Sequence, residues 1–268
     1  MKNYISLILG VFVIFFSSCT SNKREGEPRI LVFSKTMGYK HASIPMGLQA
    51  IQKLGVENNF LVDTTKNAEV FNDDELKKYS AIVFLSTTGN ILDAKQEAAF
   101  ERYIQAGGGF VGVHAATDTE YDWGWYGKLV GAYFDSHPAG TPEADFIIKD
   151  NTFGATNMFA DSIWHRADEL YNFKKINPEV KVLMTVDEKT YQGGKNGEHH
   201  PMSWYHEYDG GRAFYTALGH TDESFSEELY LKHLLGGIKY AIGKNEILDY
   251  TKVTTQIPPD SDRFTKVP

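Results

Sequence analysis

The glycine-rich stretch that ends at His114 constrains the fold of this chain more than any other. A helical pattern stops at Gly107, and a short apolar run at residues 110–113 leads into the histidine. Glycine suits a helix end and a tight turn because it adopts positive φ without strain, and a short apolar run is typical of a strand buried on both faces. Ligands bind open parallel sheets beyond the carboxyl ends of strands, so His114 is either a functional residue or a local cap.

Apolar runs alternate with helical patterns through the first half of the chain. Runs rich in β-branched and aromatic residues predict strands at residues 29–34, 60–63, 81–85 and 110–113. Apolar residues at helical spacing, with Ser43 and Asp93 as N-caps, predict helices at residues 44–54, 72–78 and 93–106. Four strands alternating with helices within about ninety residues predict an α/β domain in which helices cover both faces of a parallel sheet.

The second half of the chain is less regular. A hairpin is predicted from residues 202–208 and 212–218, because Asp209-Gly210-Gly211 between them accepts the positive φ of a tight primed turn. Further strands are predicted at residues 144–148 and 180–186, and an amphipathic helix at residues 227–242. The predicted domain therefore spans residues 29–243, and residues 244–268 are predicted to form an irregular C-terminal tail.

The amino terminus predicts export. A basic start, an apolar run at residues 4–16 and the small residues before Cys19 are typical of a signal peptide over residues 1–18, too short to span a bilayer comfortably. Cys19 is the only cysteine, which excludes a disulfide framework, and its setting resembles a bacterial lipoprotein box. That resemblance implies lipidation of Cys19, a tether at residues 19–28 and anchoring to a bacterial membrane, on the periplasmic side or the cell surface. The alternative is an ordinary cleaved secretory signal.

Charge and aromatic content narrow the class of partner. The net charge is −8, the acidic residues are scattered, and we find no clustered Lys/Arg face, which argues against nucleic-acid binding. Aromatic residues make up 13% of the chain, and many lie between Tyr121 and Tyr133 and around Trp204. Aromatic loop residues are common in sugar sites, where rings stack on pyranose faces, but they also serve in core or lid packing.

Several histidines are predicted to gather at one edge of the sheet. Four of them follow the carboxyl ends of predicted strands or lie in adjoining loops: His41, His114, His137 and His220. Four histidines at one edge indicate a site, although any one of them can instead be a local cap. We expect His199, His200 and His233 to be solvated, and His206 to be either core or surface.

A series of motifs gives the chain a family resemblance. In chain order these are residues 108–116, Trp123, residues 126–131, Phe134, His137-Pro138, and residues 168–171, 201–204 and 211–220. With them the chain resembles the ThuA-like (trehalose utilisation) family. The resemblance implies a flavodoxin-like three-layer domain with a mainly parallel sheet, similar to class I glutamine amidotransferases. Those enzymes carry a nucleophilic cysteine where this chain has His114, so amidotransferase chemistry lacks its thiolate.

The resemblance also implies a role in carbohydrate metabolism, tied to disaccharides or their 3-keto forms, and the residues leave three mechanisms open. In one, His114, His137 and His220 bind a divalent, zinc-like metal ion, because neutral imidazole is a common ligand of such ions. In another, His114 is a general acid or base with Asp118 or Glu169 as its partner.

In the third mechanism the pocket binds a sugar without chemistry. The expected sugar-binding residues are His41 and the stacking platforms Trp123, Trp125, Tyr126 and Trp204. The sequence therefore predicts an exported hydrolase or lyase of glycosides or keto-sugars with a histidine-rich site. The alternative is a non-catalytic carbohydrate-binding lipoprotein.

Overall fold

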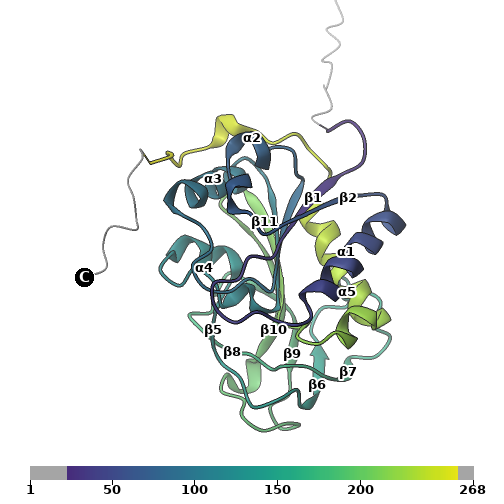
Figure 1. Ribbon diagram of the computed structural model, residues 1–268. Helices are drawn as coiled ribbons and strands as arrows, with labels where there is room; N and C mark the ends of the chain where they lie inside the picture. Colours follow the sequence, from purple (N-terminus) through teal and green to yellow (C-terminus); the bar gives the residue numbers. More distant parts are fainter. Residues whose placement is uncertain (1–22, 259–268) are drawn as a thin grey trace, which may run out of the picture.

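The computed structural model describes residues 23–258, and its centre is one nine-stranded sheet. The strands follow the order β2-β1-β3-β4-β11-β10-β9-β6-β7 (Figure 1). Their bounds are β1 (Arg29–Phe33), β2 (Leu61–Thr65), β3 (Ala81–Leu85), β4 (Gly109–Val113), β6 (Glu143–Ile148), β7 (Ile163–Ala167), β9 (Lys181–Val186), β10 (Pro201–Tyr208) and β11 (Gly211–Thr216). The predicted α/β fold class is confirmed.

Five neighbouring strands of this sheet are parallel. β2, β1, β3 and β4 pair in parallel with one another, and β11 joins them with Arg212 opposite Gly109. Every residue of β3 and β4 is buried, as the apolar runs predict for strands covered on both faces. Parallel pairing brings the carboxyl ends of these strands to one edge of the sheet.

The strand direction changes at β11. This strand is parallel to β4 but antiparallel to β10, and β9, β6 and β7 continue the antiparallel part. The turn between β10 and β11 is the predicted hairpin, with Asp209 and Gly210 at φ 47° and 91°. β11 therefore belongs to both halves, and its carboxyl end lies beside that of β4.

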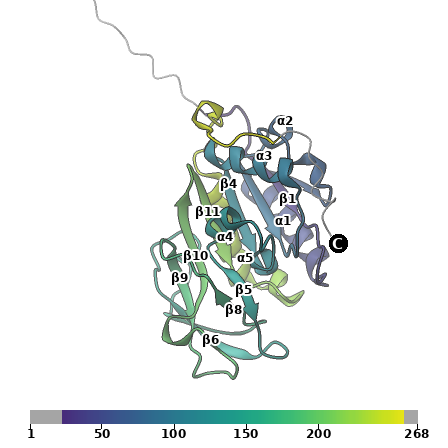
Figure 2. The same cartoon turned by 90° about the vertical axis from the view of Figure 1, so that its left-hand side faces the viewer.

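Helices cover both faces of the sheet (Figures 1 and 2). α1 (Ile44–Asn58) and α5 (Glu228–Ile242) lie on one face, and α2 (Asp73–Leu76), α3 (Ala94–Gln105) and α4 (Gly124–Val130) lie on the other. The predicted N-cap Asp93 forms a capping box with Gln96 at the start of α3. A side chain at Gly109 would collide with the backbone of Ala241 in α5, which is a further reason for glycine before β4.

A small second sheet lies next to the carboxyl edge. β5 (Tyr133–Ser136) and β8 (Asn172–Lys174) pair antiparallel, and β5 contacts the 3₁₀ turn His114–Thr117. The aromatic ring of Phe134 lies 4.3 Å from that of Tyr171 in the segment before β8. This sheet therefore forms one wall around the end of β4.

Both ends of the described chain lie at the opposite, amino edge of the parallel strands. Lys23 forms an isolated β-bridge with Glu246, and the guanidinium of Arg24 donates to the carbonyl of Tyr79, just before β3. In the C-terminal segment, the side-chain oxygen of Gln105 accepts hydrogen bonds from the backbone of residues 254 and 255. The described parts of both predicted terminal segments are therefore attached to the domain.

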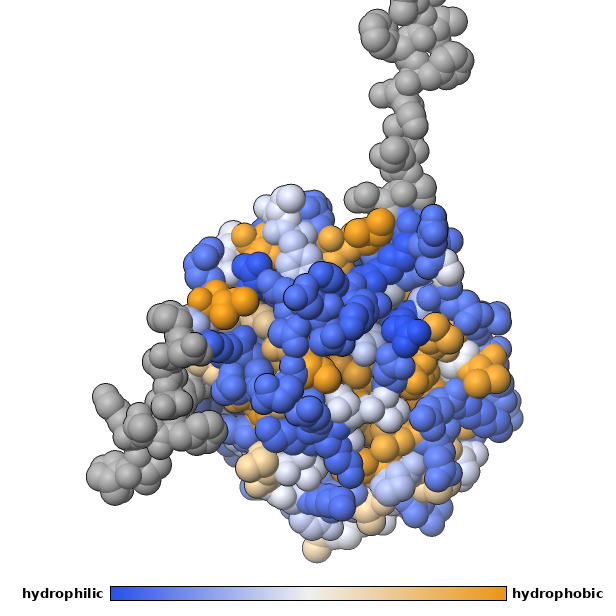
Figure 3. All heavy atoms as spheres, turned by 45° about the horizontal axis from the view of Figure 1, so that its top comes forward, coloured by the Kyte–Doolittle hydropathy of each residue, from blue (hydrophilic) through white to orange (hydrophobic). Residues whose placement is uncertain are grey.

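The described surface is mainly hydrophilic. On the face shown in Figure 3, apolar side chains form separate small groups among polar ones. Among residues 23–258, no helix combines the length and apolar character needed to cross a membrane. The predicted signal peptide and Cys19 lie outside the described residues.

Candidate metal centre

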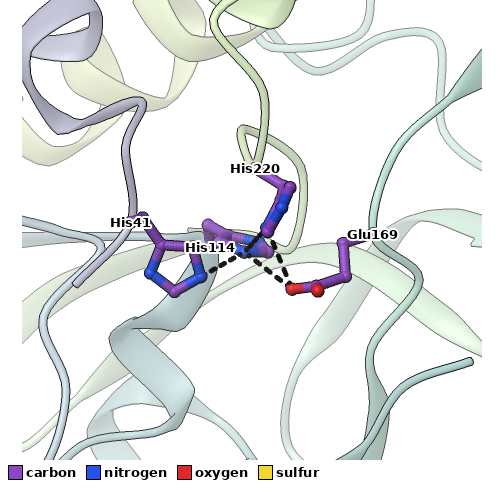
Figure 4. Close-up of side chains that lie close together, drawn as sticks. All are labelled: His41, His114, Glu169 and His220. Atoms are coloured by element: carbon purple, nitrogen blue, oxygen red, sulfur yellow. Dashed lines mark hydrogen bonds and ion pairs between the residues drawn. The ribbon is translucent and has the colours of Figure 1, made fainter. Parts of the chain in front are cut away.

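Three histidines and one glutamate converge at the carboxyl edge of the parallel strands (Figure 4). His41 lies in the loop between β1 and α1, His114 directly follows β4, and His220 follows β11. Glu169 comes from the connection between β7 and β8. One ligand atom from each residue lies within 4.8 Å of every other. These four residues are called the histidine cluster below, and three of them share the edge expected from the sequence.

His114 occupies a sharp backbone turn at the end of β4. Its φ is 51°, in the left-handed region that residues with a side chain rarely adopt. The hydroxyl of Tyr215 in β11 donates to the His114 carbonyl at 2.7 Å, and the imidazole is fully buried. The neighbouring strand thus holds an uncommon conformation that directs the ring across the end of the sheet.

A backbone carbonyl sets the tautomer of His114. Nδ1 of His114 lies 2.7 Å from the carbonyl oxygen of Ala217, which only accepts hydrogen bonds, so Nδ1 carries the proton. When the ring is neutral, the lone pair of Nε2 then faces the cluster. Nε2 lies 3.1 Å from Nε2 of His41 and 3.2 Å from Nδ1 of His220. The ring is therefore oriented as a metal ligand with a carbonyl behind it.

Four of the six separations between the ligand atoms, at 3.0–3.3 Å, are close to those around a metal ion. Oε2 of Glu169 lies 3.3 Å from Nε2 of His114 and 3.0 Å from Nδ1 of His220. Ligands that are about 2.0–2.2 Å from a tetrahedral ion lie about 3.3–3.6 Å from one another. Three nitrogens and one oxygen in this arrangement fit a divalent cation such as Zn²⁺ after small side-chain shifts.

Burial and mutual contact determine the charges in the cluster. Burial, together with the nearby His114 and His220, lowers the pKa of His41 to about 3, so this ring is neutral. The hydrogen bond to Glu169 raises the pKa of His220. Burial opposes ionisation of Glu169, but hydrogen bonds with the two histidines outweigh it and lower the pKa of its carboxyl. The cluster thus presents a carboxylate among imidazoles, the donor set that a divalent cation requires.

His137 lies beside the cluster and not within it. Its Nδ1 is 3.3 Å from Oε1 of Glu169, the oxygen that faces away from the cluster nitrogens, and 2.7 Å from the carbonyl of Pro138. Its side chain is 38% exposed. The structure therefore brings His41 and Glu169 to His114 and His220, and it leaves the predicted ligand His137 outside the cluster, because the β1–α1 loop and the β7–β8 connection come closer to His114.

Asp118 has a different partner from the one expected. Its carboxylate accepts a hydrogen bond from the hydroxyl of Tyr121 at 2.6 Å, and burial raises the pKa of this carboxyl despite that bond. Glu169 is the carboxylate in contact with His114. Of the two predicted partners, the structure brings Glu169 to the histidine.

The predicted stacking platforms are packed inside the protein. Tyr126 and Trp204 are fully buried and Trp123 nearly so, because each ring fills space between the sheet and its covering segments. Trp125 is partly exposed, but its ring nitrogen donates to Asp209 in the β10–β11 turn, at the other end of the strand from the cluster. These four residues offer no ring face to a ligand in the cluster, which corrects the expectation.

Tyr39, which is not among the predicted site residues, is an exposed aromatic residue beside the cluster. Its side chain is 66% exposed, and its ring centroid lies 4.8 Å from that of His41. Thr88, after β3, holds the backbone here: its hydroxyl donates to the carbonyl of Tyr39 and its carbonyl accepts from Met37. Proximity in sequence to His41 is the signal that points to Tyr39.

Two histidines expected on the surface lie in the interior. His200 and His233 are fully buried, whereas His199 is exposed as predicted. Nε2 of His200 lies 2.6 Å from the carbonyl of Tyr171, and Nδ1 of His233 lies 2.7 Å from the carbonyl of Ala155. Each ring therefore joins two segments of the fold, which explains its burial.

Solved structures share this fold. A ThuA-like protein from Bacteroides uniformis ATCC 8492 superposes with a TM-score of 0.69 at 22% identity, covering 83% of this chain and 94% of that one. A ThuA-like protein from Parabacteroides merdae ATCC 43184 gives 0.68 at 18% identity, covering 82% and 91%. A β-galactosidase from Bacillus circulans sp. alkalophilus gives 0.50 at 12% identity, covering 82% of this chain but 31% of the enzyme. At these identities the likeness establishes the fold alone.

The sequence itself identifies the family. No curated protein matches the chain. The family model described as ThuA, trehalose utilisation, matches residues 29–241, a segment that includes every residue of the histidine cluster. Since this match covers well over half of the sequence, the chain belongs to the ThuA (trehalose utilisation) family.

Proposed function

We propose that the chain binds a divalent metal ion in the histidine cluster and uses it to hydrolyse or eliminate a glycosidic bond in a disaccharide or 3-keto-sugar. The observation that carries this proposal is the convergence of three imidazole nitrogens and one carboxylate oxygen, with His114 in contact with all three partners at 3.1–3.3 Å. Membership of a family described by trehalose utilisation supports the carbohydrate substrate.

The four cluster residues would hold the ion. His41 is neutral, His114 has its Nε2 lone pair directed inward, and Glu169 supplies the negative charge. A bound divalent cation supplies Lewis-acid polarisation of a sugar carbonyl or hydroxyl. His220 lies on the accessible side of the cluster, with a side chain that is 24% exposed, so a substrate approaches from there.

His137 is the residue placed to move a proton next to the cluster. Its Nδ1 faces two acceptors, Glu169 and the Pro138 carbonyl, so Nδ1 carries the proton and Nε2 keeps a lone pair. The ring is partly exposed and is fixed from behind by Glu169, as general bases are when a carboxylate orients them. In this proposal Nε2 of His137 accepts a proton from the substrate.

Tyr39 provides the aromatic surface at the site. A pyranose ring presents an apolar face that packs against an exposed aromatic ring, and the Tyr39 ring is both exposed and adjacent to His41. The hydrogen bonds to Thr88 fix the loop backbone, so little loop entropy is lost on binding. A sugar ring stacked on Tyr39 would place its functional groups at the cluster.

The chemical proposal is tested with trehalose, cellobiose and their 3-keto forms. The full chain is incubated with each sugar, with and without a chelator, and products are separated by liquid chromatography and mass spectrometry. We expect turnover that needs the metal and is lost in His114→Ala. Elemental analysis that finds no divalent ion in active protein would refute the metal. Saturable binding of these sugars without turnover would instead support the carbohydrate-binding lipoprotein.

We propose in addition that the protein is exported and anchored by a lipid at Cys19. The support is the sequence of the first nineteen residues, with its basic start, apolar run and small residues before the only cysteine. Palmitate labelling in a bacterial host tests it: label is expected in the wild type and lost in Cys19→Ala. Equal labelling of both proteins would overturn the anchor.

A further inference from the structure

Asp168, the residue before Glu169, lies behind the histidine cluster and is completely buried. Its Oδ1 accepts hydrogen bonds from the backbone N–H groups of Glu169 at 2.8 Å and of His220 at 3.1 Å. Its Oδ2 accepts from the backbone of Gly219 at 3.0 Å and from the side chain of Arg166 at 3.0 Å. One carboxylate therefore contacts the backbone of two cluster residues at once.

These two cluster residues come from distant parts of the chain. Glu169 lies between β7 and β8 at the antiparallel side of the molecule, whereas His220 follows β11 in the parallel half. Their side chains meet at 3.0 Å. Because Asp168 binds both main chains, a shift of either segment alone would break a buried hydrogen bond that water cannot replace. The distance between the two ligand atoms is thus tied to Asp168.

The surroundings of Asp168 require a carboxylate. Its fifth partner is the hydroxyl of Ser224 at 3.4 Å, so groups that donate face both of its oxygens. An asparagine here would turn an NH₂ group toward at least two N–H donors, leaving them without an acceptor. Five hydrogen bonds therefore converge on this side chain.

The positive partner of Asp168 is also held from several sides. The guanidinium of Arg166 lies over the rings of Trp164 at 4.6 Å and Tyr230 at 5.3 Å, and it makes an ion pair with Glu227 at 3.2 Å. Stacking on aromatic rings restricts the guanidinium, so Asp168 is fixed in turn. Arg166 thereby connects the back of the cluster to α5 and to the turn before it.

Asp168 also contributes charge. A buried carboxylate behind two ligands makes the electrostatic potential in the cluster more negative, which favours a cation there. Geometry and charge therefore act in the same direction.

We propose that Asp168 is the positioning residue that holds Glu169 and His220 in ligand geometry, and that it thereby sets the affinity of the cluster for a divalent cation. This inference rests on the proposed metal centre. Asp168 does not contact the ion or a substrate and acts through the backbone of its two neighbours in the cluster.

The test measures Co²⁺ affinity and the visible absorption of bound Co²⁺ in the metal-free full chain. Asp168→Asn keeps the volume of the side chain and removes its charge and one acceptor. Groups behind metal ligands typically contribute a factor of about 10–100 in metal affinity, so we expect the Kd for Co²⁺ to rise by about that factor and the absorption spectrum to change.

Glu120→Gln is the matched control. Glu120 is also a buried carboxylate that accepts two backbone N–H groups, those of Ile91 and Leu92 at 2.7 and 2.8 Å, and it is not part of the cluster. We expect a lower melting temperature in both variants, but a Co²⁺ Kd within about twofold of the wild type in Glu120→Gln. A purely structural role of Asp168 would give the same pattern in both.

The outcomes separate this inference from the proposed function. Wild-type affinity and spectrum in Asp168→Asn overturn the role of Asp168 and leave the metal centre standing. A wild-type chain that binds neither Co²⁺ nor Zn²⁺ overturns both. If Asp168→Asn does not fold, Ser224→Ala removes one donor to Asp168 and keeps the charge. Its Kd is expected to rise about two- to tenfold, and an unchanged Kd overturns the inference.

Discussion

Two histidine–glutamate pairs in this molecule have similar contacts and different surroundings. Nδ1 of His200 lies 2.8 Å from Glu188, and Nδ1 of His220 lies 3.0 Å from Glu169. In the first pair the remaining ring nitrogen ends at the carbonyl of Tyr171, and Glu188 accepts two backbone N–H groups. In the second pair the carboxylate meets further imidazoles. The first pair therefore joins the loop after β9 to the segment before β8. In the second pair, the ring nitrogens of the cluster face one another and the carboxylate.

The second ring nitrogen distinguishes the buried histidines outside the cluster from His114 within it. His114, His206 and His233 each place one nitrogen 2.7–2.8 Å from a backbone carbonyl. The other nitrogen of His206 and His233 has no hydrogen-bond partner among residues 23–258, whereas that of His114 faces the rest of the cluster. A hydrogen bond to a backbone carbonyl therefore shows only that a ring is held in one orientation. The environment of the opposite ring nitrogen is what differs between His114 and the other two histidines.

Replacing His114 by alanine is the strongest way to test this difference. Nε2 of His114 contacts all three other ligand atoms, so its loss opens the cluster. If a four-ligand zinc site contributes about 10–16 kcal/mol, one ligand accounts for about 3–4 kcal/mol, or a 10²–10³-fold rise in Kd. Calorimetric titration of metal-free protein with Zn²⁺ measures it. An unchanged Kd would place the ion elsewhere.

The pH dependence of the free energy of unfolding tests a buried histidine outside the cluster, His233. Burial lowers the pKa of His233 to about 4, whereas an unfolded chain binds this proton near pH 6.5. The stability that the neutral ring contributes is present above pH 6.5 and is lost as the pH falls toward 4, up to about 3 kcal/mol. Urea unfolding at pH 7 and 4.5 should show that the free energy of unfolding falls less between these pH values for His233→Gln than for the wild type. Equal declines would contradict the assignment.

His200→Ala is expected to destabilise the protein without emptying the cluster. It removes the ring that contacts both Glu188 and the Tyr171 carbonyl and leaves that carbonyl without its imidazole partner, which costs about 1–3 kcal/mol of unfolding free energy. Urea unfolding of metal-free protein measures this cost, and Zn²⁺ titration should give a Kd within about threefold of the wild type. A loss of affinity as large as that in His114→Ala would remove the distinction between the two pairs.

The smallest expected effect is on sugar affinity and concerns Tyr39, beside the cluster. Tyr39→Ala removes an exposed ring beside His41 and should raise the KM or Kd for a sugar about five- to tenfold, since aromatic packing contributes about 1 kcal/mol. Tyr39→Phe keeps the ring and should match the wild type, and neither change should alter Zn²⁺ affinity. Equal sugar binding by the alanine variant would show that the ligand approaches from another side.

Much of the parallel half of the fold could be predicted from local patterns. Apolar runs and helical spacing are properties of short segments, so β1, β3, β4 and the hairpin of β10 and β11 lie close to their predicted positions. The placement of β6, β7 and β9 beside them depends on contacts between distant segments. No periodicity within one segment encodes such contacts, so the order in which β9, β6 and β7 follow β10 emerged only from the structure.

The site could be predicted only to the edge of the sheet. Strand ends placed His41, His114 and His220 together. Glu169 was one of two candidate partners of His114, and the choice between them depends on the path of the β7–β8 connection, which no local pattern gives. The burial of His233 did have a signal. It lies in α5 between Tyr230 and Gly237, on the apolar face of that helix, so helical spacing alone predicts an interior position.

The arrangement of the chain ends has a practical consequence for handling the protein. Both described ends lie at the amino edge of the parallel strands, and the cluster lies at the carboxyl edge. Strands of five residues rise about 3.3 Å per residue, which separates the two edges by about 15–20 Å. A protein immobilised through its amino terminus on a sensor chip should therefore present the cluster to the flowing solution, and the support should not obstruct a ligand.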